Sequence, residues 1–357
     1  MQYDIAIIGA GPAGVALASF LSKQYRILLL DRRDLIDGEN QKAKCCGGLL
    51  APDAQKMLGR MGLAVPKSVL VDPQIFLVRT IDFDNYLETF YQRYYFNMSR
   101  FSFDEWLVSS IPDNVDLALG CRFTSLVECK DGYELAFLYK NKIYTERVKL
   151  IIGADGAWSK VRDQIYGENN NLKKYIAIQE WFETDKNLPY YGAIFDSSIT
   201  DFYSWTIPKE GKLIIGSALA PQKEANKKFE NLKSKLREYG IVFGNCIKRE
   251  GAYLIRPTRK DIVTGNDHAA LVGEAGGFIS PSSAEGISFA LKSAYALAMS
   301  LNEGIGDFQK RYRKNLRPVL RSITFKELKS PGMYNKTIRG MVMKSGILSC
   351  KRLFNQD

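Results

Sequence analysis

The residues best suited to bind a ligand stand near the start of the chain, in a glycine-rich run. Gly9, Gly11 and Gly14 have the spacing G-x-G-x-x-G, with Pro12 and Ala13 between the last two. In this pattern the first glycine allows a tight turn, the second lets the backbone approach a diphosphate, and the third lets a helix pack closely on a strand. The amide groups at the helix N-terminus then face the phosphates. The run therefore predicts a dinucleotide phosphate site.

The segments around this run are the elements that must position it. An apolar strand is expected over Tyr3–Ile8, a helix from Pro12 to Ser22, and a second strand over Arg26–Leu30. A strand, a tight turn and a helix N-terminus together hold a diphosphate in sites of this type. The second strand brings Asp31 to the same edge of the sheet.

Asp31 is placed about 20 residues after the first glycine, where dinucleotide-binding proteins carry an acidic residue. Its carboxylate is expected to accept hydrogen bonds from the ribose hydroxyls of an adenosine, with Arg32 beside the cofactor. FAD and NAD share the adenosine diphosphate half, so this segment alone leaves both cofactors open.

Later motifs distinguish between these cofactors. Residues 153–162 read GADGAWSKVR, and residues 273–287 read GEAGGFISPSSAEGI. Together with RFSFDEWL at residues 100–107, they resemble the ordered motifs of the flavoprotein-hydroxylase fold, which is para-hydroxybenzoate-hydroxylase-like. The resemblance implies an FAD-binding protein rather than an NAD dehydrogenase, and it implies that Arg100 reaches the cofactor.

Two shorter segments point to a narrower group. KCCGGL at residues 44–49 looks like the C-G-G segment of the geranylgeranyl reductase family. YSWTIP at residues 203–208 looks like the YxWxFP motif of that family, with Ile207 in place of Phe. The wider sequence, including QKAKCCGGLLAPDAQ and FDSSITDFYSW, is similar to the bacterial CbrA-like branch of the family over essentially the whole chain.

The resemblance also assigns the residues around the flavin. Glu274, where the family usually has Asp, is expected at the ribitol hydroxyls. The helix that Gly286 and Ile287 open is expected to direct its N-terminal amides at the pyrimidine edge of the ring. The predicted cofactor-binding residues are Gly9, Gly11, Pro12, Ala13, Gly14, Asp31, Arg32, Cys46, Gly47, Gly48, Arg100, Phe123, Asp155, Gly273, Glu274, Gly286 and Ile287.

The predicted substrate site lies beside the flavin. Cys46 is expected next to the ring, either with a catalytic part or with a structural one. Tyr203 and Trp205 are expected to wall an apolar cavity, with Pro281 at the substrate; the alternative for the aromatic pair is plain sheet core.

Reductases of this family are similar in using reduced FAD to saturate isoprenoid double bonds, which implies the same reaction here on an isoprenoid or other apolar substrate. Two alternatives stay open: an FAD-dependent aromatic hydroxylase, and a flavin-binding sensor without turnover at the membrane surface. No second G-x-G-x-x-G unit occurs. We therefore expect NAD(P)H to bind only transiently, or a reduced donor protein to supply the electrons.

The order of elements predicts the α/β class. Buried strands near the start, at Val148–Ile152 and at Ala269–Val272 suggest one sheet assembled from distant segments, and aromatic, alternating stretches between them suggest an inserted antiparallel sheet. We expect a Rossmann-type FAD-binding domain at 1–70, 98–172 and 262–305, an antiparallel-sheet substrate domain at 71–97 and 173–261, and a basic helical C-terminal region at 306–357.

The charge of the chain is concentrated at its C-terminus. The 357 residues carry a net charge of +11, and from Arg311 to Asp357 twelve Lys or Arg stand against two acidic residues. This region is either a solvated helical surface or a surface that attracts anionic lipid headgroups. Nucleic acid is not an expected partner, because none of the common nucleic-acid-binding motifs occurs.

Composition limits the remaining functions. Six cysteines without a CxxC pair and a single histidine, His268, argue against a metal site and against a Ser-His-Asp triad. The absence of an apolar run of about 18 residues argues against a transmembrane helix. The N-terminal strand pattern argues against a secretory signal, so a cytoplasmic protein is expected, peripheral to the inner face of the membrane if its basic region binds lipid.

Overall fold

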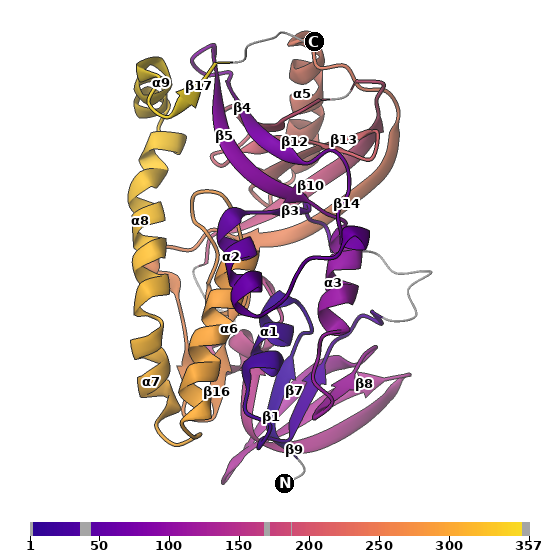
Figure 1. Ribbon diagram of the computed structural model, residues 1–357, viewed down its shortest axis with the longest axis vertical. Coiled ribbons are helices and arrows are strands. Elements are labelled where there is room, and N and C mark those ends of the chain that lie inside the picture. The colour runs from indigo at the N-terminus through magenta and orange to yellow at the C-terminus, as the bar shows by residue number, and fades with distance from the viewer. Residues whose placement is uncertain (1–2, 36–43, 168–171, 187, 352–357) are drawn as a thin grey trace.

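Two β-sheets, one toward each end of the molecule, organise the fold (Figure 1). The structure is a computed structural model and describes residues 3–35, 44–167, 172–186 and 188–351. Within these residues the first sheet has eight strands in the order β15-β16-β9-β1-β2-β6, with β8 pairing β9 and β7 pairing β8. Its strands are β1 (Tyr3–Ile8), β2 (Ile27–Leu30), β6 (Val115–Ala118), β7 (Arg122–Cys129), β8 (Gly132–Tyr139), β9 (Lys142–Gly153), β15 (Gly265–Asn266) and β16 (Ala269–Leu271).

The central strands of this sheet run parallel, and their carboxyl ends meet at one edge. β1 pairs in parallel with β2 and β9, and β16 pairs in parallel with β9. The residues at that edge are Ile8, Leu30, Gly153 and Leu271, and each lies at or within two residues of the start of a segment singled out in the sequence. In open parallel sheets, ligands bind beyond this edge. The strands expected around Tyr3–Ile8, residue 150 and residue 270 are therefore confirmed.

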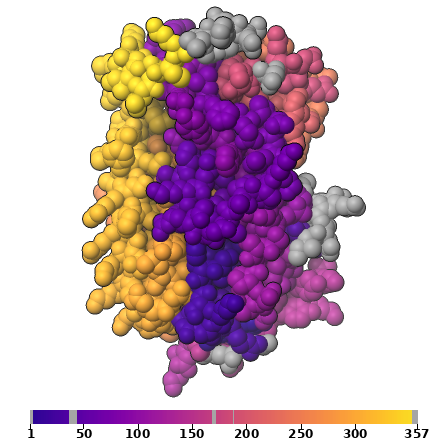
Figure 2. Space-filling model, viewed as in Figure 1, coloured from indigo at the N-terminus to yellow at the C-terminus, as the bar shows by residue number. Residues whose placement is uncertain are grey.

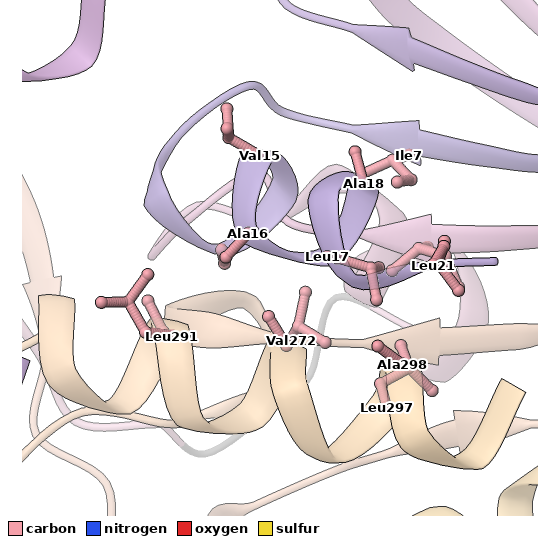
Figure 3. Close-up of a cluster of buried hydrophobic side chains, with 14 of the residues drawn as sticks. Ile7, Val15, Ala16, Leu17, Ala18, Leu21, Val272, Leu291, Leu297 and Ala298 are labelled. Carbon is pink, nitrogen blue, oxygen red and sulfur yellow. The ribbon is translucent and has the colours of Figure 1, made fainter. Parts of the chain in front are cut away.

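Helices α1 (Pro12–Phe20) and α6 (Ile287–Asn302) pack together on one face of this sheet (Figure 3). The contact side of α1 includes small side chains such as Ala16, which let the two helices approach closely. Leu17 lies opposite Leu297, and both are fully buried. The packing fixes α1 rigidly, so its N-terminus keeps its place at the ligand-binding edge.

The second sheet is mainly antiparallel and carries the aromatic stretches of the sequence, as expected. Its order is β14-β10-β13-β12-β11-β4-β5-β17, with β3 pairing β5. One pair, β4 with β11, is parallel. Its strands are β3 (Leu49–Leu50), β4 (Ile75–Asp82), β5 (Leu87–Asn97), β10 (Lys174–Glu183), β11 (Tyr191–Phe195), β12 (Ser204–Lys209), β13 (Lys212–Leu219), β14 (Cys246–Ile255) and β17 (Ser349–Cys350).

One face of this second sheet is covered by α5 (Ala225–Glu238), which was not expected from the sequence. Phe229, Leu232 and Leu236 of this helix pack against Ile215 and its neighbours. The opposite face is left to the cavity described below. Other described helices are α2 (Pro52–Arg60), α3 (Arg100–Val108), α4 (Lys160–Tyr166) and the 3-10 helices η2 (Lys67–Val69), η3 (Arg259–Asp261) and η4 (Gly273–Gly276).

The C-terminal region is helical, as predicted. Helices α7 (Phe308–Asn315), α8 (Arg317–Tyr334) and α9 (Lys336–Ser345) form a column along one side, and α8 reaches from the level of the first sheet to that of the second (Figures 1 and 2). Residues 352–357 of the predicted basic region lie outside the described residues. A search of the described helices finds none long and apolar enough to cross a bilayer.

A buried ion pair fastens α9 to the second sheet. The Arg339 guanidinium donates to both carboxylate oxygens of Asp82, at 2.7 and 2.8 Å, and to Asp84 at 2.7 Å. The side chains of Arg339 and Asp82 are 6% and 0% exposed. The C-terminal column is thus part of the fold. The division of the chain into domains stays a prediction.

The predicted fold class is confirmed: a Rossmann-type α/β unit, an inserted mainly antiparallel sheet and a helical C-terminus.

Candidate functional site

A cavity of about 1860 Å³ extends from the carboxyl edge of the first sheet to the open face of the second. Most of the residues predicted from the sequence line it. Those that do are Gly9, Gly11, Pro12, Ala13, Asp31, Arg32, Cys46, Gly47, Gly48, Arg100, Phe123, Asp155, Tyr203, Trp205, Gly273, Glu274, Gly286 and Ile287.

Gly14 and Pro281 do not line the cavity. Gly14 lies under the turn, where an added Cβ would come within 1.9 Å of the Gly9 carbonyl oxygen, so its part is close packing. The Pro281 carbonyl accepts a hydrogen bond from Nε of Arg256 at 3.0 Å. This bond ties the segment to the protein behind the cavity wall, and the structure does not bring Pro281 to the expected substrate position.

The turn before α1 is shaped to receive a diphosphate. Gly9 has φ +111°, and a Cβ there would lie 2.5 Å from the Ala154 carbonyl oxygen, so the turn requires glycine. At Gly11, by contrast, a Cβ would meet nothing within 4 Å. No side chain caps the N-terminus of α1. Backbone amides therefore face open space at the point where the G-x-G-x-x-G spacing places phosphates.

Asp31 lies at the end of β2 with its carboxylate held in place. It accepts from the Ala10 backbone N–H at 2.8 Å and from the Arg33 side chain at 3.1 Å. Arg32, which was predicted beside the cofactor, is exposed and lines the cavity. Arg33, the cation that orients this carboxylate, carries no motif and was not predicted from the sequence.

Alternating charges continue from Asp31 through Arg33 and Asp104 to Arg100. Arg33 donates to Asp104 at 2.7 Å, and Nε of Arg100 donates to the other Asp104 oxygen at 2.9 Å. Burial raises the pKa of Asp104, but Arg100 and Arg33 outweigh it and hold that pKa below its usual range. The charge of Arg100 also acts on the Cys46 thiol and lowers its pKa. Arg100 lines the cavity, and its contact with the cofactor stays a prediction. Its positive charge interacts with both Asp104 and Cys46.

Cys46 lies in a positively charged environment. Burial raises the pKa of its thiol. This effect is outweighed by Arg100, by the Gly48 backbone N–H at 3.4 Å and by Lys209, so the pKa lies below its ordinary value. Lys209 was not singled out in the sequence, although it directly follows the YSWTIP segment. Its Nζ donates to the Met98 and Gly47 carbonyls at 2.7 and 3.0 Å, and burial lowers its pKa to about 8.

We expect the thiolate of Cys46 to depend on Arg100. In an Arg100→Gln variant the pKa of Cys46 should rise, because the cation that lowers it most is removed. The pH dependence of iodoacetamide alkylation, read at Cys46 by mass spectrometry, measures this shift. Cys45 is the internal control, since burial raises its pKa to about 12. An unchanged profile would show that Arg100 does not set the ionisation of this thiol.

Two carboxylates line the cavity near the expected ribitol and phosphates. Asp155 accepts from the Ser159 hydroxyl at 2.5 Å and from the Val161 N–H at 3.2 Å, and burial raises its pKa to about 6. Glu274 accepts from the Ile255 N–H at 3.1 Å, with Nζ of Lys44 at 3.9 Å. Burial also raises the pKa of Glu274. The carboxylate oxygens of both groups can accept hydrogen bonds from ligand hydroxyls.

The part of the cavity under the second sheet is walled by aromatic residues. Tyr203 donates to the Ser283 carbonyl at 2.8 Å, and Tyr191 lines the cavity beside it. The Trp205 indole N–H donates to Gln179 at 3.4 Å. Tyr203 and Trp205 therefore belong to the cavity wall as well as to the core of the sheet. Tyr191 carries no motif and could not be found from the sequence.

The N-terminus of α6 completes the lining between the two parts of the cavity. Gly286 precedes α6, and no side-chain cap occupies this helix end. Just before it, Glu285 forms an ion pair with Arg93 at 2.6 Å and with Lys326 at 3.7 Å. Contacts from β5 and from α8 thus hold the loop that presents the helix N-terminus to the cavity.

Comparison with known proteins agrees with this architecture. Residues 7–39 match the family of NAD(P)-binding Rossmann-like domains. Among solved structures, a geranylgeranyl bacteriochlorophyll reductase-like protein from Thermoplasma acidophilum is similar with a TM-score of 0.70 and 18% identity, over 97% of this chain and 87% of that one. PqsL of Pseudomonas aeruginosa, a probable FAD-dependent monooxygenase, is similar with a TM-score of 0.69 and 15% identity, over 96% and 99%.

The chain therefore shares its fold with a reductase-like protein and with a probable FAD-dependent monooxygenase. Curated sequences are closer. Protein CbrA of Escherichia coli O6:H1 is 39% identical over 353 residues, 99% of this chain and 96% of the relative. Protein CbrA of Shigella sonnei is 38% identical over 99% of both chains. Because the identity extends over nearly the full length of both sequences, the chain belongs to the CbrA family.

Proposed function

We propose that the chain is an FAD-dependent oxidoreductase that reduces a carbon–carbon double bond in an isoprenoid or other apolar substrate. The observation that carries the proposal is the single cavity, which joins a diphosphate cradle at one end to an aromatic and aliphatic chamber at the other. When bound, reduced FAD supplies the hydride for such a reduction. The residues of the chain would bind the cofactor, orient the substrate and supply the proton.

The cofactor end of the cavity fits FAD. Gly11 leaves room for the diphosphate, and the oriented Asp31 carboxylate can bind an adenosine ribose. Glu274 faces the same cavity and can bind hydroxyl groups of the ribitol. The uncapped N-terminus of α6 offers amide groups and a partial positive charge to an acceptor at the ring edge. Each of these contacts is a proposal.

The other end of the cavity fits an apolar chain. Its walls include Val78, Ala193, Phe195 and Ile207 from the second sheet and Met343 from α9. Side chains of this kind exclude water and bind alkyl or alkenyl groups through the hydrophobic effect. Polar side chains also line this end, among them Tyr203, Gln179 and Arg93.

A hydride added to one carbon of a double bond requires a proton at the other carbon. We propose the Tyr203 hydroxyl, which donates to the Ser283 carbonyl in the structure, as the proton donor, with Tyr191 as its neighbour in the cavity wall. Burial raises the pKa of Tyr203 to about 12 and that of Tyr191 well above its ordinary value. Both hydroxyls therefore keep their protons at neutral pH.

A Tyr203→Phe substitution should slow product formation by about 100-fold, the usual size of a lost general acid, and should leave flavin reduction unchanged. The substitution keeps the aromatic ring in the cavity wall and removes only the hydroxyl group that would donate the proton. Stopped-flow measurement of the two half-reactions separates these effects. Tyr175→Phe is the matched control, because Tyr175 is buried in the same sheet but does not line the cavity. Equal slowing of both half-reactions would remove Tyr203 from the chemistry.

The proposed function is tested with purified, FAD-loaded protein reduced in the absence of oxygen. Flavin reoxidation on adding a polyprenyl compound, with a saturated product two mass units heavier, is the expected result. Reoxidation only by oxygen with hydroxylation of an aromatic compound would replace it with the monooxygenase function. No turnover with either class would leave a flavin-binding sensor.

We also propose that the electron source, NAD(P)H or a reduced donor protein, binds only transiently. Tight stoichiometric binding of NADPH to the isolated protein, measured by calorimetry, would contradict this.

A further inference from the structure

A second groove lies between α8, the central helix of the C-terminal column, and the 3-10 helix η3. It has a volume of about 360 Å³. Three arginines are among the residues around it, Arg317 and Arg321 of α8 and Arg259 of the 3-10 helix η3. Arg317 and Arg321 are four residues apart and so project from the same side of the helix. The apolar wall is formed by Leu320, Phe325 and Leu328.

The three guanidinium groups are exposed and uncompensated. Among the residues that the structure describes, none of their side chains forms an ion pair or a hydrogen bond with another residue. The acidic residue next to them is Glu327, whose carboxylate accepts the Arg259 backbone N–H at 3.0 Å and so holds η3 against α8. Clustered arginines without acidic partners favour an anionic ligand, and their planar donors suit the oxygens of a phosphate.

The groove is continuous with the mouth of the large cavity. Phe325 and Leu328 line both of them and are 57% and 74% exposed. Further exposed apolar residues that line the cavity follow in α9 and just after it, namely Val342, Ile347 and Leu348. An apolar rim of this kind around a cavity entrance is typical of an interaction site rather than of a solvated surface.

We propose that the groove formed by Arg259, Arg317 and Arg321 binds the phosphate headgroup of an anionic bilayer lipid, so that the cavity mouth faces the membrane. The arginines complement the charge of such a surface, and Phe325 and Leu328 lie where the acyl region begins. A protein in this position takes apolar molecules into the cavity directly from the bilayer. The site does not depend on the reaction performed inside.

The inference is tested by flotation of the full-length protein with vesicles. One set contains phosphatidylcholine alone and the other contains phosphatidylcholine with phosphatidylglycerol. The unaltered protein should float with the anionic vesicles. Replacing Arg259, Arg317 and Arg321 with Gln should lower the partition coefficient roughly 100-fold, about fivefold for each charge.

The matched control removes three charges outside the groove. Lys310, Arg313 and Lys314 of α7 are exposed and line neither the groove nor the cavity. Changing them to Gln removes the same charge and should have a much smaller effect. Equal losses in the two triple variants would overturn the site, because binding would then depend on net charge alone. Binding of the arginine variant at the level of the unaltered protein would also overturn it.

Two further measurements distinguish the source of the phosphate and the part of the apolar rim. Replacing Phe325 and Leu328 with Ser should weaken binding to anionic vesicles while all charges are kept. Binding of inorganic phosphate without binding to either vesicle would overturn the membrane assignment. In the arginine variant, FAD content and turnover of a detergent-dissolved substrate should be unchanged. Failure of the membrane site is thereby distinguished from failure of the proposed function.

Discussion

A Gly11→Ala variant should fold normally and bind FAD at least tenfold more weakly, a loss of about 1.4 kcal/mol. Gly11 has φ −82°, which any residue adopts, and an added Cβ meets no atom within 4 Å. The new methyl group therefore occupies only the space through which a diphosphate approaches the backbone. Flavin titration gives the affinity, and the thermal midpoint of the flavin-free protein should move by no more than about 2 °C.

Two glycines give the controls for this prediction. Gly59→Ala lies in α2 with open space around its added Cβ and should change neither FAD affinity nor folding. Gly14→Ala places a Cβ against the Gly9 carbonyl and should destabilise the flavin-free protein by about 1–3 kcal/mol. Full FAD binding by the Gly11→Ala variant would mean that the cradle beside α1 is not where the cofactor's phosphates bind.

The second large effect is expected at Arg339. Replacing it with Met should lower the free energy of unfolding by about 3–5 kcal/mol, because the Asp82 carboxylate is 0% exposed and would be left buried without its cation. Chemical denaturation measures the loss. Lys344→Met in the same helix removes an exposed charge and should cost less than about 0.5 kcal/mol.

A double variant refines this prediction. Adding Asp82→Asn to Arg339→Met removes the uncompensated charge and should recover part of the lost stability. If the single Arg339→Met variant were as stable as the unaltered protein, the ion pair between Arg339 of α9 and Asp82 of the second sheet would contribute no net stabilisation. The wall that α9 adds to the cavity would then depend on apolar packing alone.

The sequence was most informative where the physics is local. The strand at Tyr3–Ile8 has the bounds expected from its apolar run, and the following helix begins at Pro12 as predicted. It ends at Phe20, two residues before the expected Ser22, because the chain turns into β2. Glycine spacing, strand periodicity and helix starts are all set within a few residues, so a single sequence reveals them.

Helix α5 shows a local signal that was overlooked. Phe229, Leu232 and Leu236 recur at three- and four-residue intervals, which is the helical period, but no element was assigned to this part of the expected antiparallel-sheet domain. The hairpin of β7 and β8 was not assigned either. These are errors of interpretation, since the periodicity needed to find the helix is present in the sequence.

The charge network could not have been found in this way. Arg33 and Asp104 are 71 positions apart, and Arg339 and Asp82 are 257 apart. No spacing rule connects such residues, because their meeting depends on how the sheets and helices assemble. For the same reason Pro281 was predicted at the substrate site from its motif. In the structure it does not line the cavity, and its carbonyl accepts a hydrogen bond from Arg256.

The alternating charges from Asp31 through Arg33, Asp104 and Arg100 to Cys46 have one more consequence. A nucleotide ribose that competes for the Asp31 carboxylate weakens the hold of Asp31 on Arg33, and Arg33 then interacts more strongly with Asp104. Asp104 in turn neutralises less of the charge on Arg100, which leaves more of it for the sulfur atom. Alkylation of Cys46 thus becomes a reporter of adenosine binding at a distance, and a soluble adenine nucleotide alone should accelerate it.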